Sequence, residues 1–88
     1  MSKKELEEKL NKIGINKDFY SFGGVYTDGT LVLDESINYY SNDKQYKEWR
    51  VFLHERGIRY DEKIFYNEEA ALDDMYERLK KYKIPGKK

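Results

Sequence analysis

The segment that most constrains the fold is a stretch of alternating side chains over residues 48–57 that ends at Gly57. The odd-numbered positions of this stretch include Trp49, Val51 and Leu53, and the even-numbered positions include Arg50, Phe52 and His54. Because neighbouring residues of a strand point to opposite faces, this alternation predicts a half-buried antiparallel strand with the Trp49 side toward the core. The turn at residues 55–57 predicts that the strand opens a hairpin.

The second strand of this hairpin is predicted over residues 58–66. Its apolar residues share one parity and are Ile58, Tyr60, Ile64 and Tyr66. The charged run at residues 61–63 interrupts them, and we expect it to bulge outward. Apart from that bulge, the strand is expected to keep these four residues on one face.

Capped helices are predicted at both ends of the chain. Ser2 followed by Glu5 forms a capping box, and Gly14 is suited to end this first helix in a left-handed conformation. Asn67 is a favourable N-cap for the second helix. The apolar stripe of that helix consists of Leu72, Met75, Leu79 and Tyr82. A proline and a glycine follow, and residues 83–88 are expected to fray.

The central segment predicts further strands. Asp28-Gly29 lies between Val25-Tyr26 and the apolar residues 31–33, a hairpin pattern because both turn residues tolerate a positive φ. We expect the flanking strands to pair antiparallel. The glycines at positions 23–24 predict a bulge or bend, and residues 37–40 either extend the second strand or form another one.

These elements predict a single α+β domain over residues 1–88. We expect an N-terminal helix, an antiparallel sheet of about four strands, and a C-terminal helix packed on one sheet face. Charged residues make up 39% of the chain, but 16% of the residues are aromatic. Their large contact areas are expected to build a core with few aliphatic residues.

The charge balance and the lack of cysteine restrict the possible partners. Seventeen Lys and Arg residues balance seventeen Asp and Glu residues, so no global field attracts nucleic acid or an anionic membrane. The absence of cysteine removes disulfides and Cys-ligated zinc, and it fits a reducing compartment. The chain contains no apolar run of the length of a secretion signal or membrane span, so we expect a cytoplasmic protein.

No set of residues predicts catalysis, and we expect a non-enzymatic protein without metal or cofactor. His54 is the only histidine and is expected at the surface. Acid pairs such as Asp73-Asp74 diverge by about 100° on a helix, so they do not converge on one ion. Gly23-Gly24 lacks the Lys-Ser/Thr pair of a nucleotide-binding loop, and Ser21 has no visible base partner.

The strongest functional signal is the acidic, tyrosine-rich segment at residues 17–46. It holds five acidic residues and two lysines, a net charge of −3, and five of the nine tyrosines. Tyrosines supply rigid contact area, and carboxylates steer a basic partner. The residues predicted to contact a partner are Asp34, Glu35, Tyr39, Tyr40, Asp43 and Tyr46. In the alternative interpretation the tyrosines cover the core and the acids only keep the protein in solution.

Three groups of residues resemble small Firmicutes immunity proteins of polymorphic toxin systems. They are residues 18–21 with Gly23-Gly24, residues 49–52 with Glu55-Arg56-Gly57, and Phe65 with residues 68–70. The likeness covers roughly residues 6–82. It implies a helix, an antiparallel sheet and a closing helix, and a protein that binds and neutralises a cognate toxin inside the producing cell. The segment between Gly29 and Lys47 is longer than in that pattern, and the resemblance assigns no binding residues.

Two other functions fit parts of the sequence. A phage or mobile-element accessory protein would use the acidic segment to inhibit a host nucleic-acid enzyme. A small RNA-binding module would use Arg50, Arg56 and Arg59, with Phe52 as a stacking ring. Nearby acidic residues lower the positive charge of this patch, so cross-strand ion pairing is an alternative explanation for the three arginines.

Overall fold

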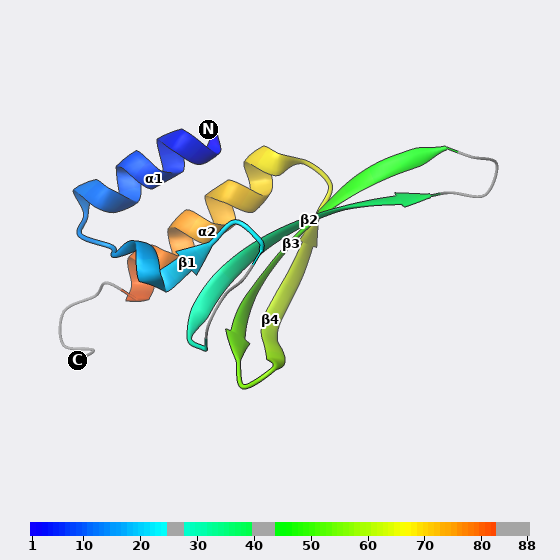
Figure 1. The fold of residues 1–88 in the computed structure, drawn as a ribbon. Helices are drawn as coiled ribbons and strands as arrows, with labels where there is room; N and C mark the ends of the chain where they lie inside the picture. Colours follow the sequence, from blue (N-terminus) through cyan, green and yellow to red (C-terminus); the bar gives the residue numbers. More distant parts are fainter. Residues whose placement is uncertain (25–27, 40–43, 83–88) are drawn as a thin grey trace.

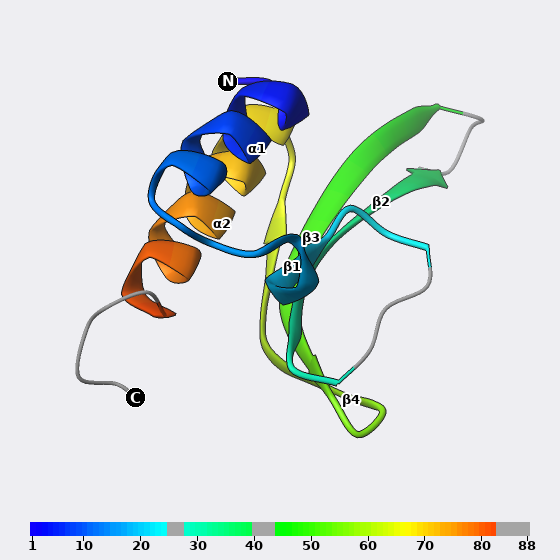
Figure 2. The same cartoon turned by 60° about the vertical axis from the view of Figure 1, so that its left-hand side comes forward.

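The structure is a computed structural model of the 88-residue chain, and it describes residues 1–24, 28–39 and 44–82. The elements are α1 (Lys3–Lys12), the 3-10 helix η1 (Lys17–Phe19), β1 (Tyr20–Ser21), β2 (Thr30–Tyr39), β3 (Gln45–Glu55), β4 (Ile58–Phe65) and α2 (Glu68–Tyr82). The strands form one sheet in the order β1-β2-β3-β4, and both helices lie on the same side of it (Figure 1, Figure 2). This architecture confirms the predicted α+β fold.

Both helices begin at the residues that the sequence indicated. The Ser2 hydroxyl accepts a hydrogen bond from the Glu5 N–H at 3.1 Å, and the Glu5 carboxylate accepts one from the Ser2 N–H at 2.7 Å. This backbone hydrogen bond from Ser2 holds the pKa of Glu5 below its usual value. The Asn67 side chain accepts a hydrogen bond from the Ala70 N–H at 2.7 Å, which caps α2 in the same way.

The sheet is mixed, because β1 pairs parallel with β2. At Leu31 and Val32 one edge of β2 is paired with β1 and the other with β3, so the predicted antiparallel hairpin across Asp28-Gly29 is wrong. The Gly29 N–H donates to the His54 carbonyl at 2.7 Å, and the Asp28 carboxylate accepts from the Arg56 N–H at 2.8 Å. These bonds tie the turn to the β3–β4 end of the sheet, so the chain enters β2 at the end where β1 begins. Val25-Tyr26, expected as the preceding strand, lie outside the described residues.

The main core lies between the helices and one face of the sheet. Val51 is fully buried there, and Trp49 and Leu53 pack against the same cluster, which confirms the predicted core side of β3. The fully buried residues that join it from β2 and the helices are Leu6, Leu10, Leu31, Ala71, Leu72, Met75 and Leu79. This core is mainly aliphatic, so the expectation that aromatic rings would build it is wrong.

A β-bulge in β4 changes which of its residues face the helices. Phe52 of β3 lies opposite two residues, Asp61 and Glu62, and Asp61 has a φ of 54°. The extra residue shifts the alternation by one, so Tyr60 lies on the helix side of the sheet and Ile64 on the opposite side. The predicted bulge is confirmed, whereas the expected common face for the apolar residues of β4 is wrong.

The sheet face opposite the helices also buries side chains. Val32 and Phe52 are paired neighbours on β2 and β3, and both are fully buried. The guanidinium carbon of Arg59 lies 4.2 Å from the centre of the Phe52 ring. The expectation that Phe52 lies on an exposed face is therefore wrong, because neighbouring side chains cover this part of the second face.

Candidate functional site

Past the body of the sheet, β2 and β3 continue as a ribbon, residues 34–39 and 45–50, which we call the arm, and β4 pairs only with its base at Trp49 and Arg50. The register of β4 ends with Phe65 opposite Trp49, so among the described residues β3 pairs with β2 alone from Glu48 outward. Figure 1 shows the arm extending away from both helices. Neither helix covers the outer end of this ribbon, where Tyr39 and Gln45 are exposed.

The residues predicted to contact a partner do not form one patch on the arm. Glu35 and Tyr39 lie on the face that continues the helix side of the sheet, whereas Asp34 and Tyr46 lie on the opposite face. Two further predicted contacts lie outside the described residues, and these are Tyr40 and Asp43. The sequence segment therefore supplies two different surfaces.

The helix-side face of the arm exposes apolar side chains. Tyr39 is 68% exposed and Ile37 is 52% exposed, and both are on β2. Their parity is the same, so the two side chains lie on one face. The sequence interpretation missed Ile37, although its spacing of two residues from Tyr39 was the signal that could have found it. These two neighbours form a candidate contact surface for a partner.

The carboxylate of Glu35, expected to steer a basic partner, is already paired within the protein. Its Oε2 lies 2.9 Å from Lys47 Nζ, and its Oε1 lies 3.8 Å from Lys3 Nζ of α1. The hydrogen bond from Lys47 holds the pKa of Glu35 below its ordinary value, and the same bond raises the pKa of Lys47. Glu35 thus positions the arm against α1, and much of its charge is compensated.

The opposite face of the arm contains an ion pair between the buried Glu48 and the half-buried Arg50, which the sequence interpretation missed. Glu48 is only 6% exposed, and its Oε1 accepts hydrogen bonds from Arg50 Nη2 at 2.8 Å and from Arg50 Nε at 3.3 Å. The hydrogen bond to Glu48 is the main cause that raises the pKa of Arg50. Opposite charges two residues apart on one strand share a face, and this spacing was the available signal.

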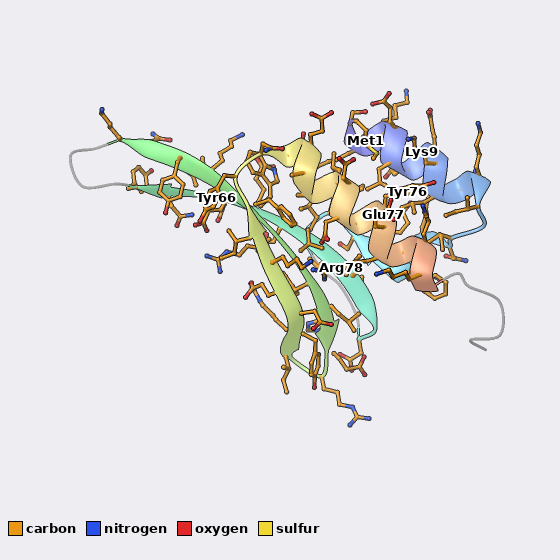
Figure 3. All side chains as sticks on the ribbon, turned by 180° about the vertical axis from the view of Figure 1, so that it is seen from behind. Met1, Lys9, Tyr66, Tyr76, Glu77 and Arg78 are labelled. Carbon is orange, nitrogen blue, oxygen red and sulfur yellow. The ribbon has the colours of Figure 1, made fainter. Side chains whose placement is uncertain are left out.

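An aromatic pair on this second face joins Tyr46, near the outer end of the arm, to Tyr66, which directly follows β4. The ring centres of Tyr46 and Tyr66 are 6.2 Å apart with a tilt of 45°. Figure 3 shows Tyr66 where the arm meets the body of the sheet. Tyr46, predicted as a partner contact, therefore packs against another ring of the same chain, while Tyr66 remains largely exposed.

The basic surface considered for RNA does not present a stacking ring. Phe52 is fully buried, with Arg59 over its ring. Arg59 Nη1 donates to Glu62 at 2.9 Å, and Arg50 is held by Glu48. A base cannot stack on Phe52 in this arrangement, because access to the ring is closed.

His54 lies beside the turn that precedes β2. Its Nε2 is 3.5 Å from a carboxylate oxygen of Asp28, and its side chain is 19% exposed. It is therefore more enclosed than the surface position expected for it. Within residues 1–24, 28–39 and 44–82, no group of three or more His, Asp or Glu residues is arranged to hold a metal ion. No helix in these ranges has the length and apolar character needed to cross a membrane.

No family model, curated protein or solved structure matches this chain. The assignment of a site therefore depends on the geometry of the arm itself.

Proposed function

We propose that this protein is a non-enzymatic immunity protein that binds a cognate toxin domain in the cytoplasm and blocks it with the arm. The observation that carries the proposal is the exposure of Ile37 and Tyr39 on one face of a projecting ribbon. The resemblance to polymorphic-toxin immunity proteins supports the choice of partner.

The exposed pair suits a role in binding. Isolated two-stranded ribbons are marginally stable in water, so a partner that covers both strands also orders the ribbon. Tyrosine is enriched at the energetic centres of interfaces, because it buries a large rigid area at a small cost in side-chain entropy. Tyr39 is therefore the proposed anchor, and Ile37 extends the apolar contact along β2.

The charges of the arm favour binding through apolar contacts over electrostatic steering of a charged partner. Its carboxylates are Asp34, Glu35 and Glu48, and the neighbouring cations are Lys3, Lys47 and Arg50. Ion pairs within the protein satisfy Glu35 and Glu48. A surface of this kind has a weak net field, so we expect binding to depend little on salt. The same pairing disfavours the accessory-protein alternative, which needs a row of free carboxylates.

Two matched substitutions test the role of the arm. Tyr39→Ala and Phe19→Ala each remove an exposed ring, the first from the arm and the second from η1. Binding to a purified cognate toxin domain is measured by calorimetry. We expect Tyr39→Ala to weaken binding by about 2 kcal/mol, roughly thirtyfold in Kd, and Phe19→Ala to leave it unchanged.

Either of two results would remove the arm from the interface. The first is unchanged affinity of a folded Tyr39→Ala protein for the toxin domain. The second is an equal loss in Phe19→Ala, since that ring lies on the body of the protein. Protection of toxin-expressing cells by the same two variants provides an independent comparison.

A further inference from the structure

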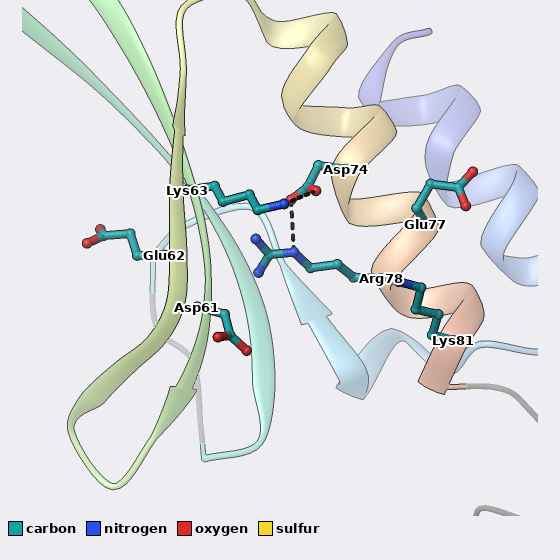
Figure 4. A pocket seen from close by; sticks show the side chains of 7 residues that line it. All are labelled: Asp61, Glu62, Lys63, Asp74, Glu77, Arg78 and Lys81. Atoms are coloured by element: carbon teal, nitrogen blue, oxygen red, sulfur yellow. Dashed lines mark ion pairs between the residues drawn. The ribbon is translucent and has the colours of Figure 1, made fainter.

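A groove of about 480 Å³ lies between α2 and the bulged part of β4, away from the arm. Figure 4 shows Lys63 and Asp61 reaching it from β4 and Asp74, Arg78 and Lys81 reaching it from α2. The groove lies where the bulge interrupts the regular pairing of β4 with β3 and where α2 packs beside these strands.

Arg78 is the least exposed cation of the groove. Its side chain is 14% exposed, and its Nε lies 2.9 Å from Asp74 Oδ2, whose side chain is 16% exposed. The terminal Nη2 of Arg78 is buried and has no hydrogen-bond partner in the part of the chain that the structure describes. A buried N–H without a partner lowers stability, so a ligand that accepts its hydrogen bond gains free energy.

The side chain of Lys63 reaches across the groove beside this guanidinium. Its Nζ lies 3.8 Å from Asp74 Oδ1, and its side chain is 63% exposed (Figure 4). A long, exposed lysine side chain moves at little cost. Because Nη2 of Arg78 is buried, a side chain of the groove has to move before a ligand reaches it, and Lys63 is the exposed side chain that can do so while it stays near the ligand as a second cation.

Four carboxylates and three cations line the groove, and two of the carboxylates are paired with cations outside it. Glu62 pairs with Arg59 at 2.9 Å, and Glu77 pairs with Lys80 at 3.6 Å, so both acids are compensated by cations that do not line the groove. The remaining lining charges are Lys63, Arg78 and Lys81 against Asp61 and Asp74. A monoanion therefore fits this balance better than a dianion, which the two carboxylates would repel.

We propose that this groove binds a carboxylate group, with the terminal edge of Arg78 as its main donor and Lys63 and Lys81 as flanking cations. The planar guanidinium presents two parallel N–H groups that match the two oxygens of a carboxylate. The acid belongs to a free small molecule or to the C-terminus of a peptide, and the test separates these sources. This site is independent of the proposed binding of a toxin by the arm.

Titration of the full chain followed by NMR tests the site. Sodium acetate, N-acetylglycine, sodium phosphate and sodium chloride are added at matched ionic strength and pH. We expect saturable shifts of the Arg78 Nε–H signal and of backbone amides in residues 74–81 with the two carboxylates, and none with chloride. Tighter binding of N-acetylglycine than of acetate identifies a peptide C-terminus, and equal binding identifies any small carboxylate.

Three variants assign the shifts to the groove. Arg78→Gln is expected to abolish saturable binding, and Lys81→Gln to weaken it about threefold, as for one exposed charge. Lys4→Gln removes the same charge from α1 and is expected to leave binding unchanged. The Lys81 variant keeps the test decisive if Arg78→Gln unfolds. Non-saturable shifts, equal shifts with chloride, stronger binding of phosphate, or full affinity in Lys81→Gln would overturn the proposal.

Discussion

Lys47 Nζ of β3 lies 2.9 Å from Glu35 Oε2 of β2, on the face of the arm that continues the helix side of the sheet. Lys3 of α1 approaches the other oxygen of the same carboxylate at 3.8 Å. The arm is thus linked to the body of the protein by a charged contact at its base, beyond the backbone of β2 and β3. Its outer side chains, Ile37 and Tyr39, remain exposed.

The pKa of Glu35 is expected to depend on Lys47. It lies below the ordinary value of 4.5 in the folded protein, chiefly because Lys47 donates a hydrogen bond to the carboxylate. Carboxyl-detected NMR titration should therefore show a rise of this pKa in Lys47→Gln, with a smaller residual lowering from Lys3. Lys44→Gln is the matched control and should leave the pKa of Glu35 unchanged.

The same shift sets the sign of a pH effect on stability. Because folding lowers the pKa of Glu35, its contribution is fully present above the unfolded pKa and is lost as the pH falls through the folded pKa. The difference in stability between wild type and Lys47→Gln should therefore shrink below about pH 4. A difference that stays constant between pH 7 and pH 3 would contradict this account.

Removal of Arg50 should destabilise the protein more than neutralisation of Glu48. Arg50→Met leaves the Glu48 carboxylate, which is 6% exposed, without its hydrogen-bond donor, and we expect a loss of about 2–3 kcal/mol. Glu48→Gln keeps an oxygen that accepts from Arg50, so its cost should stay below about 1 kcal/mol. Urea unfolding of the two variants gives both numbers, and the reverse order would rule out the pair as a structural contact.

Phe52→Ala should be strongly destabilising although it lies on the face opposite the helices. The ring is fully buried, so its loss is expected to cost about 3–5 kcal/mol through lost burial and a residual cavity. Ile58→Ala in β4 is the control, because Ile58 is 53% exposed, and its cost should be below about 1 kcal/mol. Similar midpoints for the two variants in chemical unfolding would show that the second face is loosely packed.

Asp61 at the bulge should tolerate glycine better than valine. Its φ of 54° lies in the left-handed region, which a β-branched residue adopts at a cost of roughly 1–2 kcal/mol. Asp61→Val is therefore expected to destabilise by about this amount, whereas Asp61→Gly should be neutral or slightly stabilising. Thermal unfolding measures the change in stability of the two variants. Their backbone amide NMR spectra show whether the bulge stays at the same position, because a bulge that moves along β4 would shift the signals of the neighbouring residues.

Much of the fold could be predicted because its signals are local. The caps at Ser2 and Asn67 and the turn before Ile58 depend on residues that are close in sequence. The direction of β1 could not be predicted in this way. β1 pairs parallel with β2, and the turn at residues 28–29 is bound to residues that are distant in sequence: the Gly29 N–H donates to the His54 carbonyl, and the Asp28 carboxylate accepts from the Arg56 N–H.

The candidate site was predicted only in part. Tyr39 was identified and is exposed, but Ile37 beside it was missed. Glu35 was assigned a steering role because a sequence does not reveal that Lys47 and Lys3 will approach it. Whether a carboxylate on this strand is free or paired depends on which cations the strand register and the position of α1 bring near it.

The sequence alone determined the α+β class, the helix starts and the core side of β3, because capping, turn formation and strand alternation act over a few residues. Tertiary structure decided the parallel pairing of β1, the burial of Phe52 and the faces of Tyr60 and Ile64. The pairing of β1 and the burial of Phe52 depend on residues that are far apart in sequence. For β4 the reason is that one additional residue in a bulge exchanges the two faces of the strand. Which residue is added depends on the register against β3, and hence on contacts across the whole sheet.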